Sequence, residues 1–151
     1  MIDPVRKLIS RLDHERTPIV TPAELRRWPG DAVAFLKNTG ILREIAPAES
    51  LFYGGCDEGC VITPDLVENP ETGRAVAVHY CKRDGCGRIT FDPDELRQWQ
   101  PDIASFASFV AAQLDLGASA TPVVPERIYL LGVIGTGSGP LDVFLGRGLR
   151  F

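Results

Sequence analysis

The chain has 151 residues, of which 44% are hydrophobic and 24% are charged, as in an ordinary soluble protein of one domain or two small ones. Acidic residues outnumber basic ones by 20 to 16, so the protein as a whole is not a polycation, and nucleic-acid binding would need a local basic patch. No apolar stretch is long enough to span a membrane, and residues 1–7 do not resemble a signal peptide. We therefore expect a cytoplasmic protein with no membrane partner, whose cysteines stay reduced.

Two helices are expected near the N-terminus. Asp3 and Pro4 predict the start of the first one, because Asp caps helix N-termini and Pro is tolerated at the first helical position. Apolar residues then recur at helical spacing and predict its buried face: Val5, Leu8, Ile9 and Leu12. Residues 21–24, Thr-Pro-Ala-Glu, form a capping box that predicts a short second helix through Arg27.

A third helix is expected over residues 31–38, with Gly40 as its C-terminal cap. Its inward residues are predicted to be Ala32, Phe35 and Leu36. Residues 41–45 and 51–53 then read as two strands that pair across a turn at residues 46–50. The first part of the chain therefore predicts a small helical domain that ends in a hairpin.

These three helices, followed by strands, resemble a winged helix-turn-helix domain over residues 1–53. Residues 35–42 look like the end of a recognition helix that runs into the first wing strand. The resemblance implies that the third helix enters the major groove of DNA. The residues that it would point outward are Asp31, Ala34, Lys37 and Asn38. Asn38 suits adenine and Lys37 suits guanine or phosphate, whereas Asp31 repels the DNA backbone.

The four cysteines of the chain form two close pairs: Cys56, Cys60, Cys81 and Cys86. Three residues separate the first pair, four separate the second, and twenty lie between the pairs. Two short turns that each present two sulfur atoms suit a tetrahedral zinc ion, and the glycines beside the pairs allow such turns. We therefore predict one structural Zn²⁺ bound by all four thiolates, which leaves no open position for a substrate. The alternatives are disulfides, redox-active thiols, another metal, or a coincidental clustering of four unrelated cysteines.

Three short strands are predicted around the cysteine pairs, at residues 61–63, 74–80 and 88–91. Residues 69–73 have the composition of a turn that joins the first of these strands to the second. Two glycine-bearing cysteine turns at the ends of short antiparallel strands resemble a zinc ribbon over residues 54–91. His79 is expected to lie beside the metal without binding it, since four cysteines complete the tetrahedron.

The last part of the chain, residues 92–151, predicts two helices and a β-hairpin. Residues 92–95, Asp-Pro-Asp-Glu, are a capping box for a helix through Trp99. A longer helix is expected over residues 101–117, with apolar residues at helical spacing: Ile103, Phe106, Ala107, Val110 and Leu114. Residues 118–125 read as a linker.

The hairpin is predicted from strands at residues 127–134 and 141–145, which flank a glycine-rich loop at residues 135–140. A phosphate-binding loop would be followed by a helix, whereas here a proline and a strand follow, so no small-molecule substrate site is expected there. A hairpin alone is marginally stable, so it must pack on the rest of the protein or pair with a partner.

The sequence as a whole predicts an α+β protein with a winged-helix-like domain, a zinc-ribbon-like module, and a C-terminal part of helices and a hairpin. It shows no Ser-His-Asp set, nucleophile elbow or histidine–carboxylate metal cluster, so we do not expect an enzyme. The leading hypothesis is a zinc-stabilised nucleic-acid-binding or transcription-regulatory module that contacts DNA mainly through phosphates. The alternative is a non-catalytic protein–protein interaction adaptor with a structural zinc site. The candidate DNA contacts are Arg26, Arg27, Lys37, Asn38, Arg43, Lys82, Arg83 and Arg88.

Overall fold

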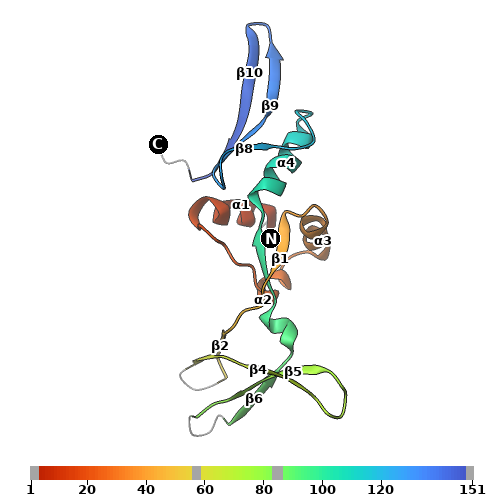
Figure 1. Ribbon diagram of the computed structural model, residues 1–151, viewed down its shortest axis with the longest axis vertical. Coiled ribbons are helices and arrows are strands. Elements are labelled where there is room, and N and C mark those ends of the chain that lie inside the picture. The colour runs from red at the N-terminus through yellow and green to blue at the C-terminus, as the bar shows by residue number, and fades with distance from the viewer. Residues whose placement is uncertain (1–3, 56–58, 83–86, 149–151) are drawn as a thin grey trace. The chain divides into compact units, whose positions relative to one another are not determined.

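The computed structural model describes residues 4–55, 59–82 and 87–148 (Figure 1). It is an α+β fold with N-terminal helices, several small antiparallel sheets, one further helix and a C-terminal three-stranded sheet. The predicted α+β class is therefore confirmed. Within these residues, no helix is both long enough and apolar enough to cross a membrane.

The chain divides into two compact units, which are described separately. Unit 1 comprises Met1–Ile19, Arg26–Arg43 and Trp99–Phe151, and unit 2 comprises Val20–Leu25 and Glu44–Gln98. Unit 1 thus joins residues from the first and last of the three predicted parts. The chain passes from one unit to the other four times, on either side of residues 20–25, within β1 (Leu42–Ile45) and within β7 (Gln98–Pro101). Strands β1 and β7 pair with each other.

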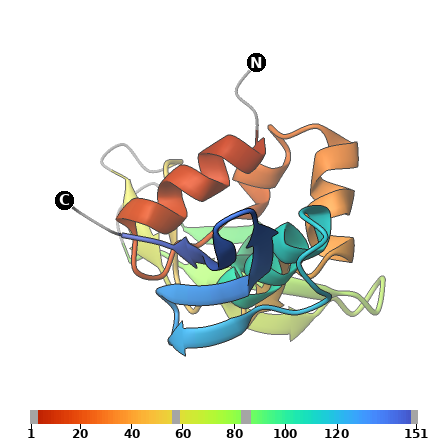
Figure 2. The ribbon, with the colours of Figure 1, turned by 90° about the horizontal axis from the view of Figure 1, so that it is seen from above.

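The helices of unit 1 are α1 (Pro4–His14), α3 (Gly30–Asn38) and α4 (Ile103–Gln113). Asp102 caps α4, since its carboxylate accepts hydrogen bonds from the backbone N–H groups of Ala104 and Ser105. Helices α1 and α4 lie next to one another in both views of the chain (Figures 1 and 2). They share a buried core with the sheet: Leu12, Ile103, Ala107, Ala111, Tyr129 and Leu131.

Two predicted inward residues of the N-terminal helices are more exposed than expected. Ile9 is 44% exposed, because the buried stripe of α1 is narrow and follows every fourth residue, at Pro4, Leu8 and Leu12. Phe35 is 40% exposed and packs edge-on against Phe109, with the ring centroids 5.3 Å apart. The prediction that these two residues lie on buried faces was therefore wrong, although the helices themselves form where the pattern predicts them.

The C-terminal sheet of unit 1 contains β8 (Thr121–Val124), β9 (Ile128–Thr136) and β10 (Gly139–Gly146), in the order β10-β9-β8. The predicted hairpin is confirmed: β9 and β10 pair up to Thr136 and Gly139, and Figure 1 shows them reaching beyond α4. The prediction of a linker over residues 118–125 was wrong for β8. Its prolines suggest a loop, but Pro122 is tolerated because β8 is an edge strand.

Gly132 marks the closest approach of β9 to the chain that follows α4. Its φ is +154°, which residues with a side chain rarely adopt, and an added β-carbon would overlap the carbonyl oxygen of Leu116. We expect Gly132→Ala to lower the free energy of unfolding by about 2–4 kcal/mol in a urea titration. The unfavourable φ of residue 132 and the overlap of its new β-carbon with Leu116 both destabilise the folded state. The control is Gly135→Ala in the same strand, where nothing lies within 4 Å of an added β-carbon. Equal stability of the two variants would contradict this close approach.

Unit 2 contains a short helix, α2 (Pro22–Leu25), a 3-10 helix, η1 (Pro93–Leu96), and two small antiparallel sheets. One sheet pairs β2 (Leu51–Tyr53) with β3 (Cys60–Ile62). The other contains β4 (Asp65–Glu68), β5 (Ala75–Tyr80) and β6 (Arg88–Phe91) in sequence order. The sheets meet at two buried residues, Ile62 and Ile89.

Strand β4 was missed by the sequence analysis, which joined residues 61–63 to β5. The predicted turn at residues 69–73 does form, with the N–H of Gly73 donating to the carbonyl oxygen of Asn69 (2.8 Å), but it joins β4 to β5. All four residues of β4, Asp-Leu-Val-Glu, are exposed, so no alternation of buried and exposed side chains marks the strand.

The predicted pairing of residues 41–45 with residues 51–53 was wrong, since β1 pairs with β7 and β2 pairs with β3. The segment at residues 46–50, predicted as the turn between β1 and β2, instead contacts η1: the N–H of Ala48 donates to the carbonyl oxygen of Leu96 (2.8 Å). The predicted helix through Trp99 was also wrong. The Asp92 cap forms, but the helix stops at Leu96, and the strand that follows buries Trp99 to 4% exposure.

Candidate metal centre and nucleic-acid contacts

The first cysteine pair lies at the loop of the β2–β3 hairpin. Tyr53 and Cys60 are the last cross-strand pair before this loop. Since side chains alternate along a strand, Cys60 points to the same side as Ile62, and it is half-buried against the core of unit 2. Phe52 and Val61 point to the other side and are 72% and 73% exposed. The hairpin therefore turns its cysteine inward and two large apolar side chains outward.

The second pair lies at the loop of the β5–β6 hairpin. Tyr80 and Arg88 are the last cross-strand pair, and the N–H of Cys81 donates to the carbonyl oxygen of Gly87 (2.9 Å), which closes the loop one step further. Cys81 is half-buried against the same core as Cys60. Gly59 and Gly87 have φ values of +68° and +60°, so the predicted need for glycine beside the cysteine pairs is met there.

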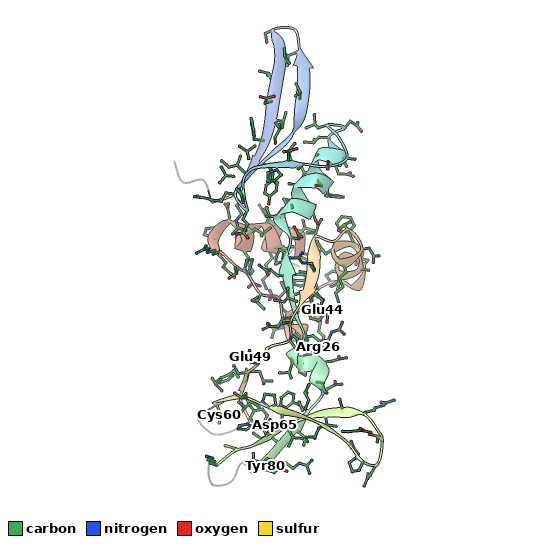
Figure 3. The ribbon with its side chains drawn as sticks, viewed as in Figure 1. Arg26, Glu44, Glu49, Cys60, Asp65 and Tyr80 are labelled. Atoms are coloured by element: carbon green, nitrogen blue, oxygen red, sulfur yellow. The ribbon has the colours of Figure 1, made fainter. Side chains whose placement is uncertain are left out.

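The two hairpins bring their cysteines to one place. Cys60 and Cys81 are separated by 20 residues, yet both pack against the cluster formed by Ile62 and Ile89. Figure 3 labels Cys60 among the side chains of unit 2. The other predicted ligands, Cys56 and Cys86, lie outside the described residues. In the sequence, Cys56 precedes Cys60 by four positions and Cys86 follows Cys81 by five. Cys60 and Cys81, the two described cysteines, pack against the same core.

This arrangement fits a four-thiolate zinc ion. The described residues alone contain no group of three or more His, Cys, Asp or Glu side chains placed to hold a metal ion, so a site here must draw on both loops. Thiolate is a ligand that zinc prefers, and a closed tetrahedron of four would fix the two hairpins to each other. Such an ion supplies architecture and no chemistry, because no coordination position stays open for a substrate.

His79 is oriented by the backbone. Its Nδ1 lies 3.0 Å from the carbonyl oxygen of Thr63, and because a carbonyl oxygen only accepts hydrogen bonds, Nδ1 carries the proton. Nε2 is therefore the nitrogen that could bind a metal. The bond to Thr63 links β5 to the residue that follows β3, and the expectation that His79 lies beside the metal without binding it stays a prediction.

The candidate contacts on α3 are exposed, as predicted, but one of them is also engaged. The Nζ atom of Lys37 lies 4.2 Å from the centroid of the Trp99 ring, so the buried indole holds the ammonium group at the surface by a cation–π contact. Asn38 is exposed beside it. Asp31 is exposed at the start of α3, where its carboxylate accepts a hydrogen bond from the N–H of Ala32 (2.9 Å). The helix thus presents one fixed cation and one acidic group.

The candidate arginines differ in their surroundings. Arg43 has a side chain that is 68% exposed, and its Nη1 lies 3.6 Å from a carboxylate oxygen of Asp102. Such an exposed pair contributes little to stability, so the guanidinium stays available to a stronger anion. Arg26 and Arg27 are exposed in unit 1, and Lys82 and Arg88 are exposed in unit 2. Arg83 lies outside the described residues.

The fold separates the charges of the chain. Unit 1 has 11 basic and 8 acidic residues, whereas unit 2 has 5 basic and 12 acidic residues. The sequence analysis missed this asymmetry because it weighed the net charge of the whole chain. A count over residues 44–98, which hold 11 of the 20 acidic residues, would have revealed it.

Comparison of this chain with protein-family models, with curated proteins and with solved structures finds no match.

Proposed function

We propose that the protein is a zinc-stabilised nucleic-acid-binding module, in which unit 1 contacts DNA through phosphates and zinc holds unit 2 together. The observation that carries this proposal is the separation of charge, with an excess of basic residues in unit 1 and of acidic residues in unit 2. A polyanion is attracted to the first unit and repelled by the second. Four thiolates around one Zn²⁺ add two further negative charges to unit 2, which strengthens the contrast.

The charge separation divides the candidate DNA contacts. Unit 1 holds Arg26, Arg27, Lys37, Asn38 and Arg43, and unit 2 holds Lys82, Arg83 and Arg88. We assign DNA binding to the first set. The residues of the second set lie in a unit whose net charge opposes them, so their attraction for phosphate is offset by neighbouring carboxylates.

The likeness to a helix-turn-helix protein gives this assignment limited support. The order of α2 and α3 agrees with it, but β1 and β2 do not form the wing. On α3, Lys37 and Asn38 are the candidate base readers, and Asp31 opposes the phosphate backbone. Binding through phosphates needs no wing and few base readers, which is why we favour it over sequence-specific recognition.

The test compares two double variants in binding to a random-sequence DNA duplex at low salt. Arg27→Ala with Arg43→Ala removes two cations from unit 1, and Lys82→Ala with Arg88→Ala removes two from unit 2. We expect the first variant to bind more weakly and to lower the steepness of the salt dependence by about 2, and the second to bind as the wild type does. A larger loss in the unit 2 variant would overturn the assignment.

One observation favours the adaptor as a second candidate function. Phe52 and Val61 are cross-strand neighbours that are both more than 70% exposed, and they belong to the acidic unit. An apolar protein segment with basic flanks would match this surface. Failure of the whole chain to bind any DNA at low salt would place this alternative first.

A further inference from the structure

A hollow of about 430 Å³ lies in unit 1, where the end of α1 meets the segments that precede β9 and follow β10. Figure 2 shows the end of β10 beside α1. Three arginines from distant parts of the sequence line it: Arg16, Arg127 and Arg147. The sequence analysis did not single out any of them, because no local motif connects residues so far apart.

Hydrogen bonds to the backbone fix the hollow in place. The Nη2 atom of Arg147 donates to the carbonyl oxygens of Glu15 (3.2 Å) and Arg16 (2.9 Å), just past the end of α1. The Nη2 atom of Arg127 donates to the carbonyl oxygen of Gly148 (3.4 Å), whose N–H donates to Asp13 (2.8 Å). These hydrogen bonds connect the segments that line the hollow. They use only some of the five N–H groups that each of Arg127 and Arg147 carries.

The carboxylates around the hollow are largely committed elsewhere. Glu15 accepts two hydrogen bonds of 2.9 Å from Arg11, and this bond keeps the pKa of Glu15 below its usual value, so it stays charged and paired. Asp13 accepts the N–H of Gly148. In the part of the chain that the structure describes, no carboxylate lies within ion-pair distance of Arg16, Arg127 or Arg147.

We propose that this hollow is an oxyanion site, in which Arg16, Arg127 and Arg147 bind a phosphate group. Guanidinium groups present parallel N–H donors that match the oxygens of phosphate, and among the described residues none of the three is held in an ion pair. The phosphate belongs either to a small phosphorylated molecule or to a nucleic-acid backbone. The proposal rests on the geometry of unit 1 and does not require that the protein bind DNA.

Three carboxylates line the hollow, and all of them oppose an anion: Asp13, Glu15 and Glu126. Asp13 accepts the N–H of Gly148 and Glu15 is paired with Arg11, so Glu126 is the carboxylate that can be changed without removing one of these bonds. It has a φ of +60° and is exposed at the edge of the hollow, directly before Arg127. Its charge lowers the affinity of the site. Neutralising it in Glu126→Gln should therefore strengthen phosphate binding, which is the opposite of what general damage to the fold would cause.

The test is a titration of the full chain with inorganic phosphate at constant ionic strength, followed by NMR of the backbone amides. We expect saturable shifts at residues 13–16, 125–127 and 147–148. Arg16→Gln should weaken binding about tenfold, because one charge-assisted contact is lost. Arg6→Gln, which removes an exposed arginine of α1 that lies outside the hollow, should leave binding unchanged. Arg147 is left intact because it holds the end of α1.

The absence of saturable shifts, or equal affinities in Arg16→Gln and Arg6→Gln, would overturn the proposal. A salt series with duplex DNA then identifies the source of the phosphate. If the hollow holds a backbone phosphate, Arg16→Gln lowers the salt dependence of DNA binding by about 1 and Arg6→Gln does not. If phosphate binding is lost while DNA binding is unchanged, the site takes a small phosphorylated molecule. Phosphate binding without any DNA binding would support this site and reject the proposed function.

Discussion

Cys81→Ser and Cys60→Ser should each abolish zinc binding and unfold the two hairpins of unit 2. Structural zinc contributes roughly 10–16 kcal/mol of apparent binding free energy at neutral pH, and little else can replace it here. The two sheets meet at only two buried residues in the described cluster, Ile62 and Ile89, with half-buried neighbours around them. We expect one zinc per wild-type chain by elemental analysis, none in either variant, and collapse of the amide shift dispersion for residues 59–82.

Tyr80→Ser is the matched control for the cysteine variants. Tyr80 directly precedes Cys81 and its side chain is 67% exposed, so the variant should retain zinc and structure. Wild-type protein that is purified without chelator and contains no metal would contradict the zinc site. Alkylation of the unfolded protein without prior reduction then tests for disulfides. Four reactive thiols would exclude them, whereas two disulfides would leave no thiol to react.

DNA affinity should fall steeply with salt. Each neutralised phosphate contributes about −0.9 to the slope of log affinity against log salt, so four to six contacts give a slope of roughly −4 to −5. Between about 50 and 200 mM salt the affinity should then fall by roughly 250- to 1,000-fold. Fluorescence anisotropy with a labelled duplex measures this dependence directly.

Sequence preference should be small in the same assay, because phosphate contacts carry no sequence information directly. Random duplexes should compete almost as well as any selected site, and Lys37→Ala should weaken binding to all sequences alike. Asn38→Ala is the control, since it removes the neighbouring candidate base reader without changing charge. No binding at about 50 mM salt would reject the DNA proposal. A selected site that binds a thousandfold more tightly would show that α3 reads bases after all.

Local signals in the sequence predicted local structure well. Apolar spacing predicted α1, α3 and α4, and the two apolar runs around a glycine-rich loop predicted the hairpin of β9 and β10. The cysteine spacing placed the two loops, and the structure brings Cys60 and Cys81 to one core. The zinc itself stays a prediction, as do the roles of Cys56, Cys86 and Arg83.

Partner choice between strands could not be predicted in the same way. Nothing in the sequence of residues 42–45 favours pairing with β7 over pairing with β2. The two pairings differ only in contacts between distant residues, which form in the folded chain. Residues 98–101 alternate in burial, but the capping box before them favoured a helix, and Pro101 alone restricts the backbone of Gln100 to extended conformations. The arginine hollow depends on the same long-range contacts, so no local pattern pointed to it.

The division of the chain also sets the order in which its parts can form during synthesis. Unit 2 needs no residue beyond Gln98, whereas the core of unit 1 joins Leu12 to Tyr129 and Leu131, and Arg147 ties the end of β10 to the end of α1. On the ribosome, α1 must therefore wait for its core partners until the last strands have emerged. A nascent chain from which unit 2 has emerged while β9 and β10 are still inside the ribosome would hold a finished unit 2 and an open unit 1, whose apolar helix faces could be bound by a chaperone.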